Sequence, residues 1–271
     1  MKDVKNKASI LSAQNVFKSY KISGQKDILA VEDLSLDINE GEFICIVGAS
    51  GCGKSTLLNM FAGFISPTSG RLLLHGEPIV GIEPRCGMVF QSYALLPWKT
   101  VRGNVEFGLK MKGVSPKVRR ERAEYFIDLV NLGAFADRYP SELSGGMRQR
   151  VTLARIFASD PEVLLMDEPF AALDAMTRQV LQEELLRIHE DQRKTTVFIT
   201  HNIDEALVLA DRIIVLSSRP GRVKAIVKNT LARPRHMTVQ LSKEFTELKS
   251  EIWSFVEDEV RRHGSVTPEY P

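Results

Sequence analysis

The sequence has few cysteines and no long apolar run. Its 271 residues include three cysteines, Cys45, Cys52 and Cys86, which are odd in number and widely spaced. This spacing excludes a disulfide framework and a cysteine metal site, and it favours a reducing cytoplasm. The longest unbroken apolar run is FICIVGA at 43–49, whereas a membrane-spanning helix needs about 20 such residues. We therefore expect a soluble chain that does not itself cross a bilayer.

The sequence also lacks a marked excess of positive or negative charge. The 36 Lys and Arg residues nearly balance 34 Asp and Glu residues, which gives a net charge of +2 and no reason to expect a nucleic-acid partner. The amino terminus, MKDVKNKAS, has lysines but no apolar stretch behind them, so it does not resemble a signal peptide. Neither an internal repeat nor a low-complexity segment is found. The length and the 44% hydrophobic content suit one large domain, or a domain with a subdomain.

Most of the first ninety residues have strand patterns. Residues 10–22 and 30–38 alternate apolar and polar side chains, as half-buried strands do. Residues 41–48 are apolar on both faces, which is typical of a strand inside a covered parallel sheet, and a helix is predicted over 54–64. RLLLHG at 71–76 and CGMVFQ at 86–91 predict further strands.

The middle of the chain has a helical pattern. Residues 93–160 predict a mostly helical subdomain inserted between sheet elements. In it, Ser115 and Pro116 predict a helix start, and the following helix is expected to bury one stripe, formed by Val118, Phe126, Ile127 and Val130. Strand patterns return at 163–167, 195–201 and 212–218, alternating with helices. This alternation predicts an α/β fold with a parallel core.

The carboxyl-terminal stretch predicts an amphipathic helix. Apolar residues recur there at helical spacing until Gly264: Leu241, Phe245, Leu248, Ile252, Phe255 or Val256, and Val260. We expect this helix to pack on the body of the protein. A regulatory or partner-docking role is the alternative.

A glycine-rich turn at 48–56, GASGCGKST, fits the pattern of a phosphate-binding loop between a strand and a helix. Its glycines allow backbone N–H groups to surround the β-phosphate, and Lys54 supplies a positive charge to the β and γ oxygens. Ser55 offers a hydroxyl to Mg²⁺. Cys52 is either a reactive thiol, activated by the helix amino terminus, or a residue that contributes only its backbone N–H. The alternative for the whole turn is an accidental match to the pattern.

An acidic pair follows the predicted strand at 163–167. In open α/β sheets ligands bind at the carboxyl ends of the strands, where Asp167 and Glu168 stand. We expect Asp167 to reach Mg²⁺ through water, and Glu168 to orient and polarise the water that attacks the γ-phosphate. A surface Asp-Glu turn is the alternative.

A second glycine turn, LSGGMRQR at 143–150, has the same features as the first: a small hydroxyl and two glycines directly before a predicted helix. One compact domain can hardly close both turns on one nucleotide. Two copies arranged head to tail can do so, because the Lys54 turn of one and the Ser144-Gly145-Gly146 turn of the other would clamp the same ATP.

Five motifs in this order resemble the nucleotide-binding subunit of ABC transporters: GASGCGKST, LSGGMRQR, LLMDEP, AALD at 171–174 and ITHNIDEA at 199–206. The resemblance covers about residues 10–225 and leaves 226–271 as a carboxyl-terminal extension. It implies a P-loop NTPase (RecA-like) core with an antiparallel β subdomain and an inserted helical subdomain, at about 93–160. It also implies ATP and Mg²⁺ as cofactors and ATP hydrolysis as the reaction.

Further roles follow from the resemblance alone. Gln91 is similar to a glutamine that contacts Mg²⁺ and water, His201 to a switch histidine that contacts the γ-phosphate and holds Glu168, and Asp174 to an aspartate at the dimer seam. Tyr20 is similar to an aromatic residue that stacks on adenine, although a lone tyrosine or histidine is more often simply part of a strand. Met147 stands where the family has glutamine, which puts in doubt a polar contact to the ribose or the partner but not activity.

The implied site therefore has three parts. Catalysis is assigned to Glu168, His201 and Gln91, and Mg²⁺ binding to Ser55, Gln91 and Asp167. The nucleotide-binding residues are Tyr20, Gly48, Ser50, Gly51, Cys52, Gly53, Lys54, Ser55 and Thr56. Contacts from the second subunit to ATP are assigned to Ser144, Gly145, Gly146, Met147 and Asp174.

LSGGMRQR, together with the segments at 95–105, 167–178 and 219–223, resembles importers for nitrate, aliphatic sulfonates and taurine. This subgroup implies a homodimer on the cytoplasmic face of the inner membrane, a separate permease and a periplasmic solute-binding protein. The apolar residues Tyr93, Leu95, Leu96, Pro97 and Trp98 either fill the core of the helical subdomain or receive a helix of the permease. The alternatives are a non-transport ABC ATPase of DNA repair or translation, an exporter ATPase, and an importer for another small organic solute.

Overall fold

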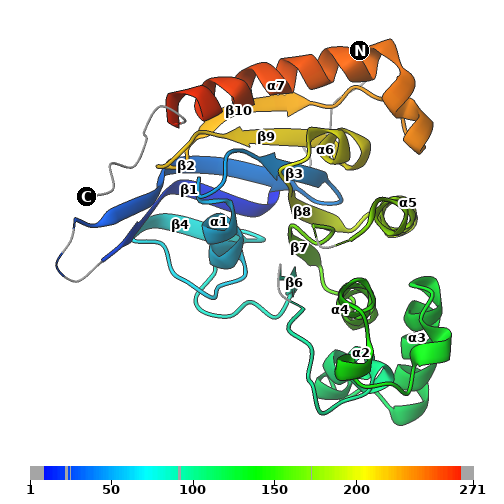
Figure 1. Ribbon diagram of the computed structural model, residues 1–271. Helices are drawn as coiled ribbons and strands as arrows, with labels where there is room; N and C mark the ends of the chain where they lie inside the picture. Colours follow the sequence, from blue (N-terminus) through cyan, green and yellow to red (C-terminus); the bar gives the residue numbers. More distant parts are fainter. Residues whose placement is uncertain (1–8, 22–23, 25, 91–92, 172, 264–271) are drawn as a thin grey trace, which may run out of the picture. The chain divides into compact units, whose positions relative to one another are not determined.

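A computed structural model describes residues 9–21, 24, 26–90, 93–171 and 173–263. The described parts of Met1–Glu83 and Gln192–Pro271 form one compact unit, and Pro84–Asp191 form a second. Figure 1 labels the helices and strands of both. Among the described residues, no helix combines the length and the apolar character that a membrane span requires.

The first unit contains an antiparallel sheet in the order β2-β1-β4-β5. Its strands are β1 (Ser9–Tyr20), β2 (Ile28–Asn39), β4 (Ser69–Leu74) and β5 (Glu77–Pro78). The predicted alternation appears in β2 from Leu34 to Ile38, whereas β1 buries the four consecutive residues from Ile10 to Ala13. Leu11, Val16, Val31, Leu34 and Ile38 lie in the core. The antiparallel β subdomain implied by the resemblance is thus confirmed.

The same unit contains a parallel core. The strand β3 (Phe43–Val47) pairs in parallel with β8 (Thr195–Ile199) on one side and with β9 (Arg212–Leu216) on the other. All five residues of β3 and of β8 are buried, as the continuous apolar run of β3 predicts. An additional strand, β10 (Val223–Lys228), runs antiparallel to β9.

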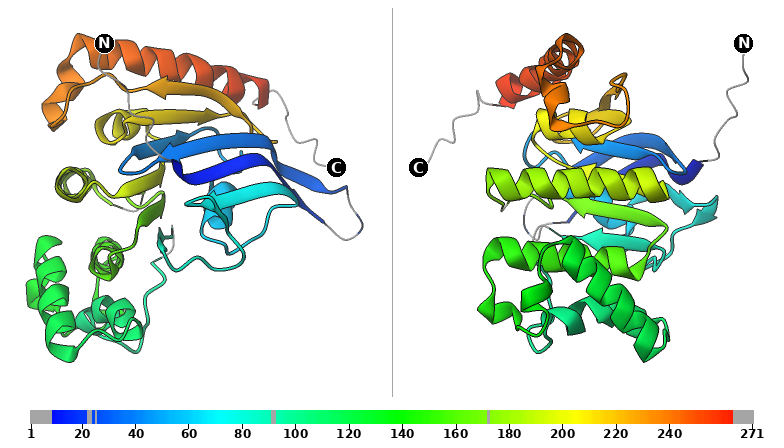
Figure 2. Two further views of the ribbon diagram at one scale, coloured as in Figure 1. Left: turned by 180° about the vertical axis from the view of Figure 1, so that it is seen from behind. Right: turned by 90° about the vertical axis from the view of Figure 1, so that its right-hand side faces the viewer.

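The described part of this unit also contains the helices α1 (Lys54–Phe61), α6 (Ile203–Leu209) and α7 (Lys243–His263), with a 3₁₀ turn η3 (Met237–Leu241) before α7. Figures 1 and 2 show α7 running along β10 and β9, and it also contacts α6. Phe245 and Ile252 are its buried residues from the predicted apolar stripe, and Leu248 is half-buried. Leu241 lies outside the helix and is exposed, and the side chain of Val260 lies outside the described residues.

The second unit pairs β6 (Cys86–Val89) in parallel with β7 (Val163–Asp167). It also holds α2 (Val101–Met111), α3 (Pro116–Leu129), α4 (Gly145–Ser159) and α5 (Ala175–Gln192), and the 3₁₀ turns η1 (Gly133–Phe135) and η2 (Pro140–Glu142). The helices α2, α3 and α4 pack on one another, and the ring centroids of Phe126 and Phe157 lie 6.2 Å apart between α3 and α4. The inserted helical subdomain of the predicted fold is confirmed.

The stripe predicted on α3 is wrong at Val118, which is exposed, whereas Phe126, Ile127 and Val130 are buried. Nine residues at about 100° each turn the helix by about 900°, so Val118 lies on the opposite side from Ile127. The helix α1 is also shorter than predicted. It ends at Phe61 because Gly63 has φ of +73°, outside the helical region.

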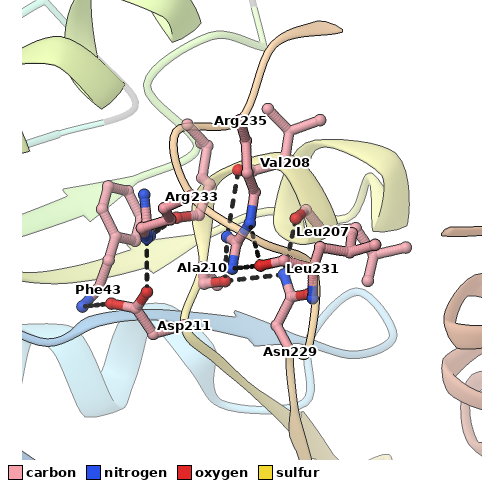
Figure 3. A network of polar contacts seen from close by, with 10 residues as sticks. Phe43, Leu207, Val208, Ala210, Asp211, Asn229, Leu231, Arg233 and Arg235 are labelled. Atoms are coloured by element: carbon pink, nitrogen blue, oxygen red, sulfur yellow. Dashed lines mark hydrogen bonds and ion pairs between the residues drawn. The ribbon is translucent and has the colours of Figure 1, made fainter. Parts of the chain in front are cut away.

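A network of side chains holds the segment after β10 against the end of α6, as Figure 3 shows. Asn229 Nδ2 donates to the carbonyls of Leu207 and Ala210 at 2.7 and 2.8 Å. Arg235 Nη1 donates to the carbonyl of Ala210 at 2.6 Å, and Arg233 Nη2 to that of Leu209 at 2.7 Å. The last carbonyls of a helix have no partner within the helix, so these side chains supply what α6 lacks.

The network also reaches the parallel core. The guanidinium of Arg233 lies 2.7 Å from Asp211 Oδ1, and Asp211 Oδ2 accepts the backbone N–H of Phe43 at 2.9 Å. Asp211 stands directly before β9, and Phe43 is the first residue of β3. Residues 229–235 are therefore bound to the same strands that position the first glycine turn.

Candidate functional site

The first glycine turn joins β3 to α1 and depends on close approach of backbone to backbone. Gly53 has φ of +97°, and a Cβ atom there would lie 2.7 Å from the carbonyl oxygen of Ala30. At Gly48 a Cβ would lie 2.9 Å from the carbonyl oxygen of Leu216. Side chains at these positions would push the turn away from its neighbours, so the turn keeps this shape only with glycine.

The amino terminus of α1 is open to an anion. Gly53 precedes the helix without a side-chain cap, and the first turn of α1 contains no acidic residue. Its N–H groups and the positive end of the helix dipole are therefore available to a phosphate. Ser50 and Ser55 are exposed beside them, and Thr56 is half-buried. These groups fit the phosphates of ATP, and the Ser55 hydroxyl fits Mg²⁺.

Lys54 brings a positive charge into this turn. Its side chain is 6% exposed, and its Nζ donates to the carbonyls of Gly48 and Ala49, both at 2.9 Å. The ammonium group is thus held over the turn by backbone carbonyls. It can act as a fixed cation for the oxygens of a bound polyphosphate.

Cys52 has the surroundings of a structural residue. Its side chain is buried, and burial raises the pKa of the thiol despite the opposing charge of Lys54. Since the thiolate is the reactive form, a raised pKa disfavours reactivity. The structure supports the reading in which Cys52 contributes its backbone to the turn.

Tyr20 lies at the end of β1, beside the same turn. Its hydroxyl is 3.4 Å from Thr56 Oγ1, and 39% of the residue is exposed. Lys18 Nζ lies 5.2 Å from the centroid of the Tyr20 ring. An exposed aromatic ring next to the phosphate turn is suitably placed to stack on a base.

The second glycine turn starts α4 in the other unit. Ser144 is the N-cap residue, and its hydroxyl oxygen accepts the backbone N–H of Met147 at 3.3 Å. No acidic residue occupies the first turn of this helix. Ser144 is exposed, whereas Gly145, Gly146 and Met147 are half-buried. This is a second helix amino terminus with small residues and no opposing charge.

The side chains around the second turn keep it in place. A Cβ at Gly145 would lie 2.8 Å from Tyr93 Oη, and the guanidinium of Arg148 lies 5.0 Å from the centroid of the Tyr93 ring. Thr152 Oγ1 donates to the carbonyl of Tyr93 at 2.8 Å. Tyr93 is therefore fixed to α4 and is no exposed docking residue.

Asp167 and Glu168 stand at the carboxyl end of β7, as predicted. Asp167 is the last residue of the strand and is 8% exposed. Glu168 is half-buried and has φ of +45°, a conformation that is uncommon for residues other than glycine and is often found at functional sites. The backbone thus turns sharply at the residue to which the catalytic base is assigned.

Three predicted site residues remain: Asp174, His201 and Gln91. Asp174 is exposed and caps α5, where its Oδ1 accepts the backbone N–H of Thr177 at 3.0 Å. That hydrogen bond lowers the pKa of the Asp174 carboxyl. His201 is exposed and lies two residues after the end of β8, separated from it by Thr200. Gln91 lies outside the described residues, so its assignment stays a prediction.

Each unit therefore assembles part of the predicted site. The first brings together Tyr20 and residues 48–56, and it also contains His201. The second contains Asp167, Glu168, residues 144–147 and Asp174. The turn at 217–222, which lies against the first glycine turn, was not predicted as part of the site. In the sequence only the Arg-Pro-Gly tripeptide at 219–221 could have pointed to this turn, because the residues it contacts, Gly51 and Cys52, are distant in the chain.

No group of three or more His, Cys, Asp or Glu side chains within the described ranges could hold a metal ion by itself. Mg²⁺ bound together with a nucleotide takes one or two protein ligands and completes its shell with phosphate and water. When bound, Mg²⁺ neutralises charge that develops on the phosphates.

Comparisons with known proteins agree with this chemistry. Residues 31–171 match the ABC transporter family. An uncharacterized ABC transporter ATP-binding protein of Methanocaldococcus jannaschii is 49% identical over 250 residues, which cover 92% of each chain. The taurine import ATP-binding protein of Roseobacter denitrificans is 47% identical over 79% of this chain and 80% of its own.

Two further similarities concern a longer relative and solved structures. The bicarbonate transport ATP-binding protein of Synechococcus elongatus is 43% identical over 93% of this chain and 38% of its own. The ABC transporter cassette MJ0796, solved as a dimer, is 35% identical and has a TM-score of 0.75 over 82% of this chain and 100% of that one. The same cassette bound to ADP and Pi after hydrolysis matches equally well. With the predicted P-loop fold confirmed, the chain belongs to the ABC transporter family and is an ATPase that uses ATP with Mg²⁺.

Proposed function

We propose that the chain is the ATP-hydrolysing subunit of a bacterial ABC importer, and that it works as a head-to-tail homodimer. The observation that carries the proposal is the pair of open helix amino termini, at α1 and α4, which both lack acidic residues in their first turns. Relatives that import taurine and transport bicarbonate support an importer, and the dimeric cassette MJ0796 supports a dimer.

In this proposal each ATP is bound by two chains. One chain contributes Lys54, Ser55 and the turn around them, with Tyr20 stacking on adenine. The other contributes Ser144, the N–H groups of Gly145 and Gly146, and contacts from Met147 and Asp174. Because the interface is two-fold symmetric, two equivalent composite sites form and the assembly closes at two chains.

Hydrolysis is assigned to the acidic strand end. Glu168 accepts a proton from the attacking water, and His201 holds Glu168 and contacts the γ-phosphate. Asp167, Ser55 and Gln91 would hold Mg²⁺, directly or through water. The N–H groups and hydroxyl of the second chain meet the charge on the far side of the γ-phosphate.

The permease is proposed to bind beside Trp98. Asn104 is completely buried, and it accepts the N–H of Leu96 at 2.8 Å and donates to the carbonyls of Leu96 and Lys99 at 3.1 and 3.0 Å. This fixes the segment, while Trp98 remains 70% exposed. An exposed indole on a rigid segment is a suitable contact for a short helix of a membrane subunit. Such docking would hold the chain at the cytoplasmic face of the inner membrane, and closure around ATP would move the permease.

The transported solute is proposed to be a small anion, such as nitrate, an aliphatic sulfonate or taurine. This rests on the resemblance of LSGGMRQR and of the segments at 95–105, 167–178 and 219–223, and on the taurine-importing and bicarbonate-transporting relatives. Bicarbonate, like nitrate, is a small inorganic anion. Co-purification with a periplasmic solute-binding protein, and stimulation of ATP turnover by its ligand in the reconstituted complex, would test both the importer and the solute.

The main alternative is an ABC ATPase of DNA repair or translation. The net charge of +2 gives no support to nucleic-acid binding. ATP hydrolysis that increases on addition of DNA or ribosomes, and not with a permease, would favour this alternative.

Composite sites predict rescue between two inactive variants. Lys54→Ala removes one half of a site and Ser144→Arg the other, so each homodimer should be inactive. In an equal mixture about half of the dimers contain both chains, and each of these has one intact site. The ATPase rate should therefore recover to roughly a quarter of the wild-type rate. A mixture as inactive as its components, at every ratio, would contradict shared sites.

Trp98→Ser should weaken permease binding without changing the ATPase rate of the isolated subunit. The substitution removes an exposed apolar contact that is distant in sequence from both glycine turns. Met111→Ser is the matched control, because Met111 has the same 70% exposure and lies at the end of α2 in the same unit. Co-purification with membrane subunits measures the effect. Equal retention of the permease by both variants would place the docking surface elsewhere.

A further inference from the structure

The turn between β9 and β10, residues 217–222, lies directly against the first glycine turn. Arg219 Nε donates to the carbonyl of Gly51 at 3.3 Å. A Cβ at Gly221 would lie 2.1 Å from the carbonyl oxygen of Cys52. Because no side chain separates Gly221 from Cys52, backbone packs on backbone there, and a shift of one segment displaces the other.

Hydrogen bonds within the turn make it stiff. Ser217 N donates to the carbonyl of Arg222 at 2.9 Å, and Ser217 Oγ donates to the carbonyl of Pro220 at 2.9 Å and accepts Arg222 N at 3.0 Å. Gly221 also exchanges backbone hydrogen bonds with β2, to Ala30 at 2.9 Å and from Glu32 at 3.0 Å. A turn closed in this way moves as one body.

The other side of the turn is bound to α7. Glu259 is 6% exposed, and its Oε2 accepts the backbone N–H of Ser218 at 2.8 Å. Its backbone carbonyl accepts Ser218 Oγ at 3.2 Å. Lys224 Nζ lies 2.8 Å from Glu259 Oε1 and also donates to the carbonyl of Phe255 at 2.8 Å. One buried carboxylate thus joins the end of α7 to the turn and to β10.

The carboxyl group of Glu259 is ionised near neutral pH. Burial by itself would raise its pKa, but the hydrogen bonds from Lys224 and Ser218 outweigh this and lower the pKa to about 2. An ionised carboxylate makes stronger hydrogen bonds than a neutral group, so its contact with Ser218 is a firm one.

We infer that Glu259 is a positioning residue for ATP binding: through Ser218 and Gly221, α7 sets the shape of the glycine turn at 48–54. The inference rests on the proposed assignment of 48–56 as the ATP phosphate site. It gives the carboxyl-terminal helix a part in nucleotide affinity, at a residue that touches neither nucleotide nor metal.

The test is a KM and kcat measurement for ATP. Glu259→Ala should raise KM about tenfold, which corresponds to about 1.4 kcal/mol, and leave kcat within about twofold. Glu259→Gln keeps an oxygen that can accept the Ser218 N–H, so its KM should rise by only about threefold. Gly221→Ala disturbs the other end of the connection and should raise KM while α7 is unchanged.

Lys249→Ala is the matched control on α7. Lys249 pairs with Asp204 on α6 at 2.7 Å and does not contact the turn, so KM should stay at the wild-type value. Thermal unfolding and circular dichroism establish whether each variant is folded. If Glu259→Ala is unfolded, the KM of Glu259→Gln provides the test.

Two results would overturn the inference. One is a wild-type KM in the folded Glu259 variants while Lys54→Ala loses ATP affinity. Residues 48–56 would then bind the phosphates of ATP, but Glu259 would have no influence on that binding. The other is an equal rise of KM in Lys249→Ala, which would indicate a general effect of α7 on stability. If Lys54→Ala itself binds ATP normally, the assignment of 48–56 fails first.

Discussion

Replacing Glu168 by glutamine is expected to lower the ATPase rate by about 100- to 1,000-fold while ATP binding is retained. A positioned general base contributes about 10² to 10⁴ to such a rate, and the amide cannot accept the proton. Glu168 stands directly after β7 in a left-handed conformation with φ of +45°. Glutamine has the same length and needs the same backbone geometry, so the difference isolates the proton-accepting group.

The consequence in solution should be an ATP-bound dimer that accumulates, visible by size-exclusion chromatography with ATP and Mg²⁺. Glu162→Gln is the control, because Glu162 is exposed and lies before the amino end of the same strand. Hydrolysis by Glu168→Gln at the wild-type rate would show that the base is another residue.

Replacing Lys54 by alanine is expected to weaken ATP binding by about 100-fold or more. Truncating one partner of a buried charge pair costs about 2–5 kcal/mol, and the ammonium of Lys54 is buried over the glycine turn. The loss also leaves the carbonyls of Gly48 and Ala49 without the donor that both contact at 2.9 Å. Titration calorimetry with ATP and Mg²⁺ measures the effect.

Lys228→Ala is the control, because it removes one positive charge, as Lys54→Ala does, but from an exposed residue on the edge strand β10. Its ATP affinity should equal that of the wild type. An unchanged affinity in Lys54→Ala would remove the assignment of the glycine turn as the phosphate site.

The strands of the parallel core could be predicted from sequence because burial on both faces leaves an unmistakable apolar run. The limits of β7 are those predicted, 163–167, and β3 lies within the predicted 41–48. Parallel strands must be covered on both sides, so few other structures suit such runs. The strand β10 was not predicted, because only Val227 is buried in it and the other residues alternate weakly on an edge.

The helical misassignments have a related cause. Val118 and Leu241 are apolar and exposed, because Val118 lies on the side of α3 opposite Ile127 and Leu241 lies in η3, before α7 begins. The spacing of apolar residues alone shows neither where a helix begins nor which of its sides is covered by other elements.

The glycine turns could be recognised because their chemistry is local: glycines, a hydroxyl and a lysine within a few residues at the start of a helix. The cap made by Asp174 is equally local, since its partner Thr177 is three residues away. The contact of residues 217–222 with Gly51 and Cys52 joins segments about 170 residues apart and has no pattern of its own. Long-range contacts of backbone with backbone are what a single sequence reveals least.

The bonds that Asn229, Arg233 and Arg235 make to the end of α6 have a consequence for where the ATPase ends. The family match stops at 171, and the motifs stop at 206. A chain shortened just after β10 would keep every motif and yet leave four carbonyls, those of residues 207–210, without their donors. The carbonyls that end α6 thus depend on side chains well beyond the last motif, and protein engineers who trim or fuse this ATPase should join beyond Arg235.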